Sequence, residues 1–244
     1  RCTAPSATVV KTGTGYTTIQ NGGLYTGGTE LLAGGLRVTD LADLGTGPIN
    51  TAAGTVLVLT HTDANPVGVN SIMQGAGIFH KEGTGTVVVN ASNSYTGGTV
   101  VQEGRLTLNY GDALGTGAIQ VNGVAMLGIA NIALANNVAG AGQIIKTATD
   151  LATLSGNNSG FTGELLVQQG AVGVSSQSAL GTGSVNVSAG ASLRYSNTTD
   201  AVFGNALSGA GTLTKQGAGR LDFTSAWSIG ALDVAAGRVR VNST

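Results

Sequence analysis

A 23-residue segment occurs three times in this chain with the same internal spacing, and this repetition limits the available folds more than any other feature. The copies are YTGGTELLAGGLRVTDLADLGTG (25–47), YTGGTVVQEGRLTLNYGDALGTG (95–117) and FTGELLVQQGAVGVSSQSALGTG (161–183). In each copy an aromatic residue precedes a glycine by nine residues and the leucine of a Leu-Gly-Thr-Gly motif by nineteen. Such spacing indicates a repeat architecture, in which each unit packs against its neighbours.

A second block recurs upstream of the aromatic segment and carries a lysine six residues after its first glycine. Its copies are GAGIFHKEGTGTVVVN (75–90), GAGQIIKTATDLATLS (140–155) and GAGTLTKQGAGRLDFT (209–224). We interpret KTGTG (11–15) as the tail of another copy and SAWSIGALDVAAGRVRVNS (225–243) as a degenerate aromatic block. We therefore expect the chain to be part of a longer array of repeats.

Apolar and polar residues alternate within the blocks, as they do from Arg105 to Asn109 and from Val185 to Ser188. A period of two predicts short, half-buried strands separated by Gly, Asn, Asp or Ser turns, and no window shows helical periodicity with caps. The sequence therefore predicts an all-β protein.

The distance between repeats indicates which all-β fold to expect. Successive aromatics lie 70 residues (25 to 95) and 66 residues (95 to 161) apart, which divides into three coils of about 22 residues, the scale of a β-solenoid turn. A β-propeller would need four strands in each 40–50 residues and blade signatures that are missing here. We predict one β-helix over residues 1–244, with blocks at about 11–74, 75–139, 140–208 and 209–244.

The composition fits such a coil and excludes several function classes. The 41 glycines suit sharp turns, and Thr and Asn on successive coils can hydrogen-bond in ladders. Only 9% of residues are charged, with 11 Lys+Arg against 12 Asp+Glu, so no basic surface is available for nucleic acid or an anionic membrane. No stretch is long and apolar enough for a membrane span. The single cysteine, Cys2, cannot form an intramolecular disulfide.

The segment GAGIFHKEGTGTVVVNASNSYTGGTVVQEGRLTL (75–108) resembles the passenger-associated transport repeat of Gram-negative autotransporters. The match weakens in the copy at 140–174, where Ala148 and Asp150 replace glycines, and the copy at 209–241 lacks Tyr-Thr-Gly-Gly. The resemblance implies a right-handed parallel β-helix, exported through the periplasm by type V secretion and displayed at the cell surface or secreted. It is closest to the self-associating and adhesin-like passengers. The residues that carry the match are Lys81, Gly83, Gly85, Asn93, Tyr95, Gly97, Gly98, Thr99, Gly104 and Leu106.

Candidate chemistry is sparse, and no catalytic residue, metal ligand or cofactor is predicted. His61 and Asp63 in HTDANP (61–66) form a metal pair or dyad on one interpretation and a polar loop on the one we favour. His80 is expected on the outward face. No protease, esterase or lyase motif and no phosphate-binding loop occurs, so we predict a protein that is not an enzyme.

Two recurring positions have both a functional and a structural interpretation. The lysines Lys81, Lys146 and Lys215 are a ligand stripe or, as we expect, solvated outward residues. The aromatics Tyr25, Tyr95 and Phe161 are a sugar-stacking platform or, as we expect, core or coil-corner residues, because Phe replaces Tyr without keeping the hydroxyl.

The predicted function is adhesion without catalysis, through self-association of two copies on neighbouring cells by polar ladders along one face, leading to aggregation and biofilm. One alternative is binding of a host protein or glycan by the irregular segments THTDANPVGVNS (60–71) and YSNTTDAVFGN (195–205), since recognition is often placed on loops. Further alternatives are a spacer or secretion-folding module, and a β-helix hydrolase whose catalytic residues lie outside these 244 residues. The candidate adhesion residues are Asp63, Asn65, Thr107, Asn109, Asn197, Thr198 and Asp200.

Overall fold

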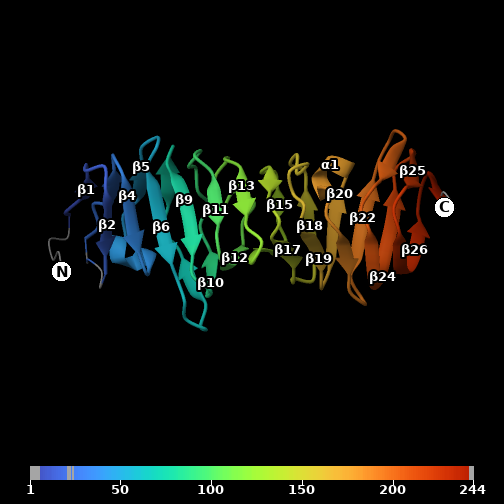
Figure 1. Ribbon diagram of the computed structural model, residues 1–244, viewed down its shortest axis with the longest axis horizontal. Helices are drawn as coiled ribbons and strands as arrows, with labels where there is room; N and C mark the ends of the chain where they lie inside the picture. The colour runs from blue at the N-terminus through green and yellow to red at the C-terminus, as the bar shows by residue number, and fades with distance from the viewer. Residues whose placement is uncertain (1–5, 21–22, 24, 242–244) are drawn as a thin grey trace. The chain divides into compact units, whose positions relative to one another are not determined.

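The computed structural model describes residues 6–20, 23 and 25–241, so Cys2 lies outside the described residues. The chain divides into two compact units, residues 1–126 and 127–244. Each unit is a β-solenoid, in which successive strands along the chain turn around a core and then pair in parallel with the strand one coil earlier. Within each unit the strands follow one another in chain order (Figure 1).

Unit 1 contains three parallel sheets. The first is β1 (Val9–Lys11), β3 (Thr29–Leu31), β5 (Ile49–Thr51) and β8 (Met73–Gly75). The second is β2 (Tyr16–Ile19), β4 (Gly35–Val38), β6 (Val56–Thr60), β9 (Ile78–Glu82), β11 (Thr99–Val101) and β13 (Ile119–Val121). The third is β7 (Val67–Val69), β10 (Thr86–Val89) and β12 (Gly104–Leu108). A 3-10 helix, η1 (Leu41–Leu44), follows β4, and β14 (Ala125–Ile129) spans the boundary between the units.

Unit 2 repeats the arrangement. One row of strands is β15 (Ala133–Leu134), β18 (Leu151–Leu154), β20 (Ala171–Val174), β22 (Ser192–Ser196), β24 (Leu207–Gln216) and β26 (Trp227–Val234). A second is β17 (Gln143–Lys146), β19 (Glu164–Val167) and β21 (Val185–Val187), which also joins β24. The third is β23 (Ala201–Phe203), β25 (Arg220–Phe223) and β27 (Arg238–Val241). β16 (Val138–Ala139) and the one-turn helix α1 (Gln177–Leu180) complete the unit.

The register between paired strands gives the length of a coil. A typical step joins Thr29 of β3 to Ile49 of β5. A shorter step of 18 residues joins Arg220 to Arg238, and a longer one of 24 residues joins Ile49 to Met73. The predicted parallel β-solenoid is therefore confirmed, with most coils slightly shorter than the spacing of the aromatic residues predicts. The right-handed sense of the coil stays a prediction.

The core is filled by the apolar residues of the alternating pattern. Leu36, Leu57 and Phe79 occupy one inward position on three successive coils and are at most 2% exposed. The same holds for Val172, Leu193 and Leu213 in unit 2. Burial of an aliphatic or aromatic side chain of this kind contributes about 1.5–3 kcal/mol, so the aligned rows are a major source of stability.

The repeated aromatic is a core residue, as predicted. Tyr25, Tyr95 and Phe161 are 1–2% exposed. The hydroxyl of each tyrosine hydrogen-bonds the threonine four residues on, at 3.0 Å in Tyr25–Thr29 and 2.6 Å in Tyr95–Thr99. Phe161 has no hydroxyl, and a leucine stands four residues on in its copy. The hydrogen-bonded tyrosine and threonine are therefore both replaced by apolar residues in this copy, so no buried hydroxyl is left without a partner at this position.

The Leu-Gly-Thr-Gly motif locks one coil to the next through a left-handed glycine. Gly115 has φ +59° and lies so close to the preceding coil that an added Cβ would be 2.0 Å from the Tyr95 carbonyl oxygen. The next backbone amide, that of Thr116, donates to the same carbonyl at 3.1 Å. Gly45 and Gly181 repeat this arrangement against Tyr25 and Phe161. The motif therefore needs glycine for both conformation and space.

Candidate functional site

Two of the predicted adhesion residues, Thr107 and Asn109, belong to the outward side of the β7–β10–β12 sheet. Thr107 pairs with Val88 of β10, which pairs with Gly68 of β7. An asparagine follows the end of each of these three strands, and we call this set the asparagine row: Asn70, Asn90 and Asn109. The Asn109 amide donates to Asn90 Oδ1 at 2.7 Å. Asn70 and Asn109 are exposed, so the row is presented to solvent.

Amide ladders of this kind recur on other faces of unit 1, as the composition predicts. Asn122 Nδ2 donates to Gln102 Oε1, one coil earlier, at 2.5 Å. On the β3–β5–β8 sheet, Gln74 donates to Asn50, which donates to Glu30. Each ladder joins side chains of successive coils, so it holds the outward polar side chains in fixed rows.

Asp63 and Asn65 lie on an exposed loop between β6 and β7. His61, which begins this loop, is 8% exposed, and its Nε2 lies 2.9 Å from the Asn65 carbonyl oxygen. The histidine therefore anchors the loop from inside. The segment 60–71, predicted to be irregular throughout, also contributes the strand β7.

The other predicted loop, 195–205, is more tightly held than expected. Asn197 is 4% exposed, and its amide donates to the carbonyls of Thr199 at 2.7 Å and Arg220 at 2.9 Å. The prediction that Asn197 is a surface contact residue is therefore wrong, because its side chain holds the coil that follows. Thr198 is exposed, whereas Asp200 accepts from the Arg220 backbone amide at 2.9 Å and pairs with its guanidinium at 3.2 Å.

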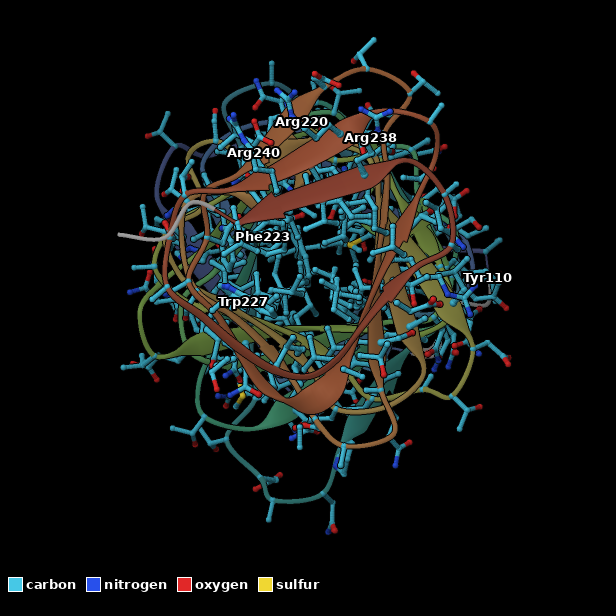
Figure 2. All side chains as sticks on the ribbon, turned by 90° about the vertical axis from the view of Figure 1, so that its right-hand side faces the viewer. Tyr110, Arg220, Phe223, Trp227, Arg238 and Arg240 are labelled. Atoms are coloured by element: carbon cyan, nitrogen blue, oxygen red, sulfur yellow. The ribbon has the colours of Figure 1, made fainter. Side chains whose placement is uncertain are left out.

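A charged ladder covers the outer side of β25 and β27, where Figure 2 shows Arg220, Arg238 and Arg240. Asp222 is held between Arg220 Nε at 2.8 Å and Arg240 Nη2 at 2.7 Å. The hydrogen bond from Arg220 keeps the pKa of the Asp222 carboxyl below its ordinary value.

A second charged contact joins Arg37 and Glu82 on the β4–β6–β9 sheet. Burial alone would raise the pKa of Glu82, but the hydrogen bond and charge of Arg37 lower it overall.

The repeated lysines are buried, which corrects the prediction that they face solvent. Lys81, Lys146 and Lys215 are 0% exposed. The Lys81 ammonium donates to the carbonyls of Glu82 at 2.9 Å, Gly83 at 2.5 Å and Glu103 at 3.1 Å. Lys215 makes the same three contacts, with Gln216, Gly217 and Ala236. Lys81 and Lys215 therefore each tie their own turn to the turn one coil later with all three N–H groups. Lys146 instead donates to the Asn131 side chain at 3.2 Å and to the Ala148 carbonyl.

The alternation of inward and outward residues in the sequence already indicates that these lysines are buried. Phe79 and Lys81 are two residues apart on one strand, as are Ile144 and Lys146, so the lysine shares the inward face of the apolar residue. Burial lowers the pKa of Lys81 from 10.5 to about 8, against an opposing effect of Glu103. His80, between Phe79 and Lys81, lies on the outward face as expected.

The described residues contain no group of three or more His, Cys, Asp or Glu side chains that could hold a metal ion. Among the same residues, no helix is long and apolar enough to cross a membrane.

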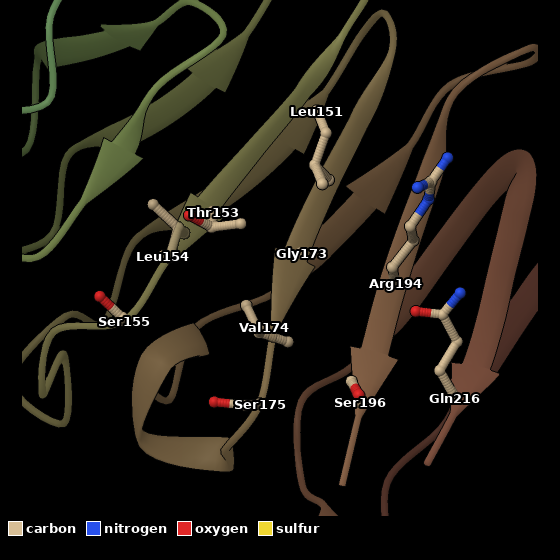
Figure 3. A pocket seen from close by; sticks show the side chains of 10 residues that line it. All are labelled: Leu151, Thr153, Leu154, Ser155, Gly173, Val174, Ser175, Arg194, Ser196 and Gln216. Atoms are coloured by element: carbon tan, nitrogen blue, oxygen red, sulfur yellow. The ribbon is translucent and has the colours of Figure 1, made fainter.

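A groove that the sequence analysis missed lies on the outward face of unit 2, along β20. Register places Gly173 between Thr153 of β18 and Arg194 of β22. Figure 3 shows Gly173 without a side chain between Leu151 and Arg194. The resulting depression has a volume of about 260 Å³. We call it the Gly173 groove; its lining residues are Leu151, Thr153, Leu154, Ser155, Gly173, Val174, Ser175, Arg194, Ser196 and Gln216.

The family described as passenger-associated-transport-repeat matches residues 9–38, 79–108 and 213–241. Three stretches of the chain therefore match the repeat of autotransporter passengers. The chain is also similar to the "Adhesin BmaC autotransporter" of Brucella suis biovar 1 (strain 1330), at 30% identity over 170 residues. That alignment covers 60% of this chain and 5% of the relative, so the chain spans a small part of that protein's length. No solved structure matches the chain.

These matches support an autotransporter passenger domain, and that family is located at the cell surface or secreted in Gram-negative bacteria. Each matched stretch begins near a lysine turn or its preceding strand and includes the left-handed glycine of the turn one coil later: Gly34, Gly104 or Gly237. The copy at 140–174 is outside the matched stretches. It is the copy that contributes Leu151, Thr153 and Gly173 to the groove, so the groove lies where the chain departs from the repeat pattern.

Proposed function

We propose that the passenger segment is a non-catalytic adhesin that binds a second copy of itself on a neighbouring cell. The contact surface would be the outward side of β7, β10 and β12, with Thr107 and the asparagine row. This contact would promote bacterial aggregation and biofilm formation after export through the periplasm. The name of the similar Brucella protein, an adhesin, supports the general role.

The asparagine row is the observation that carries the proposal. An asparagine side chain offers two N–H donors and a carbonyl with two lone pairs, and the Asn109–Asn90 contact uses only one donor and one lone pair. Asn70 and Asn109 are exposed, so their unused groups are accessible to a partner, and the paired strands hold the row in register. A second copy can therefore be bound with little further ordering of side chains, which reduces the entropy cost of association.

Low charge supports the same conclusion. With 9% charged residues, two copies approach with little repulsion, and each hydrogen bond contributes about 0.5–1.5 kcal/mol. A row of such contacts gives weak affinity for one pair of molecules, and many copies on facing cells raise the avidity.

Sedimentation velocity of the 244-residue chain over a wide concentration range tests the proposal. We expect reversible dimers in the wild type, and loss of the dimer in the double variant Thr107→Lys, Asn109→Lys. The matched control is the double variant Gln102→Lys, Asn122→Lys, which adds the same charge to a different amide ladder and should leave the dimer intact.

Two outcomes would contradict the proposal. A strict monomer at all concentrations would favour a spacer role, or ligand binding through the exposed loop that carries Asp63 and Asn65. Equal loss of the dimer in both double variants would indicate general charge repulsion rather than contact through the asparagine row.

A further inference from the structure

The Gly173 groove follows a strand whose outward residues are all small. Ala171, Gly173 and Ser175 alternate with the inward Val172 and Val174 along and just beyond β20. The neighbouring strands carry larger outward side chains, Leu151 on β18 and Arg194 on β22. The groove therefore has a floor of backbone and two unlike walls, one apolar and one cationic.

Hydroxyl and amide groups line one end of the groove. Ser155, Ser175 and Ser196 lie in that lining, and Gln216 stands beside Ser196 in the strand register. Backbone groups of β20 pair with β18 and β22 on either side, so a ligand in the groove is recognised through side chains. Because β20 is paired on both sides, it offers no free strand edge to an extended peptide backbone.

Charge in the groove has one sign. The side chain of Arg194 is exposed and makes no hydrogen bond or ion pair with any described residue, unlike those of Arg37, Arg220 and Arg240, which pair with acids. Asp150 does not line the groove, and its carboxylate accepts from Asn131 Nδ2 at 2.9 Å. An anionic group in the groove is therefore attracted to Arg194.

We propose that the Gly173 groove binds one hexuronate unit of an unsulfated acidic polysaccharide. The sugar ring lies over Gly173 with its apolar face against Leu151, its carboxylate pairs with Arg194, and its hydroxyls bond the serine and glutamine side chains. Arginine suits a carboxylate because its guanidinium offers two parallel donors. This binding goes beyond self-association and uses a different unit of the chain.

Size and charge select this ligand over other anions. The volume of about 260 Å³ is just below the range of about 300–1,000 Å³ typical of drug-sized ligands, so the groove accommodates one ring. The one unpaired arginine can pair with the one carboxylate of a hexuronate unit. A sulfated unit carries a second negative charge, and the groove lining holds no second cation to pair with it. The hydroxyl-rich end matches the several hydroxyls of a sugar better than the single polar group of an acidic peptide side chain.

The repeat itself provides the variant that tests the groove. Gly173 aligns with Arg37 in the first copy and Thr107 in the second, so a side chain is normal at this position. A Cβ at Gly173 would meet Leu151 Cδ1 and Thr153 Cγ2 at 3.4 Å, an ordinary contact, and no left-handed φ is involved. Gly173→Thr should therefore fill the groove and leave the fold intact.

Isothermal titration calorimetry with tetragalacturonate is the experiment, at a protein concentration where the chain is monomeric. We expect millimolar or tighter binding by the wild type, no detectable binding by Gly173→Thr, and at least 10-fold weaker binding by Arg194→Gln. Arg238→Gln is the matched control, because it removes an exposed arginine outside the groove and should bind as the wild type does. Circular dichroism of each variant verifies the fold.

Several outcomes overturn the proposal. These are no binding of tetragalacturonate by the wild type, or unchanged binding by Gly173→Thr or Arg194→Gln. Equal binding of hexaglutamate would assign the groove to acidic peptides, and equal binding of a sulfated heparin tetrasaccharide would contradict the match of one carboxylate. A chain that is monomeric at every concentration in sedimentation velocity and still binds tetragalacturonate would reject self-association and keep this proposal.

Discussion

At the scale of single residues, the buried lysine is the most informative feature of the repeat. A charged group in the core is costly unless hydrogen bonds satisfy it, and Lys81 donates to three carbonyls of two successive turns. Carbonyls in sharp turns often lack strand partners, and the ammonium supplies them with a donor. The lysine thus links neighbouring coils at the point where the sheets do not.

We predict that Lys81→Met destabilises the chain at pH 7 by about 2 kcal/mol or more, because the apolar side chain leaves buried carbonyls without a donor. Arg194→Met is the control. It removes an exposed cation without a partner among the described residues, and we expect a change within about 0.5 kcal/mol. Urea unfolding followed by circular dichroism measures both. A Lys81→Met variant as stable as the wild type would show that the three carbonyls find water instead.

The wild type and Lys81→Met also test a prediction about the pH dependence of stability. The folded-state pKa of Lys81 is lowered from 10.5 to about 8, so between these values the unfolded chain binds more protons than the folded chain. Stability that depends on this group therefore rises with pH in that window. We expect the difference in unfolding free energy between wild type and Lys81→Met to grow from pH 7.5 to 9.5. A difference that shrinks would mean that the carbonyls favour the ammonium more than burial opposes it.

At the scale of structural elements, the turns determine how closely coils stack. Gly104 has φ +65°, and an added Cβ would lie 2.6 Å from the carbonyl oxygens of Gly83 and Gly85 in the preceding turn. We predict that Gly104→Ala destabilises the chain by about 2 kcal/mol or more, through both strain and this clash. Gly123→Ala is the matched control, since nothing lies within 4 Å of its Cβ position, and we expect little change. Thermal unfolding compares them, and equal midpoints would contradict the prediction.

The strands and coils could be predicted from the sequence because period-two alternation and repeat spacing are local signals. The inward position of Lys81 was missed because charge was given more weight than its alternation with Phe79. Burial of Asn197 was missed because the carbonyls it binds, at Thr199 and Arg220, come together only when one coil stacks on the next. The Gly173 groove was missed for a related reason. Its signal is a glycine where other copies carry a larger residue, but its two walls come from the coils before and after it.

At the scale of the whole molecule, the small number of charges decides how the protein responds to its medium. The described residues include two partly exposed clusters of ion pairs, Arg37 and His80 with Glu82 and the ladder around Asp222. Exposed pairs of this kind contribute about 0–1 kcal/mol each and are screened by salt. The buried lysines bind neutral carbonyls in a site that salt does not reach.

We therefore predict that raising sodium chloride from low concentration to about 1 M changes the free energy of unfolding by less than about 1 kcal/mol, because hydrogen-bonded coils and apolar rows supply the stability. Urea titrations at the two salt concentrations measure this, with Asp222→Asn as a comparison that lacks the centre of the larger cluster. A large loss of stability in salt, absent from Asp222→Asn, would instead assign a major structural role to that cluster. If the stability of both proteins is insensitive to salt, the coil stays folded at about 1 M sodium chloride. The contribution of Arg194 to uronate binding can then be tested at high salt without unfolding the chain.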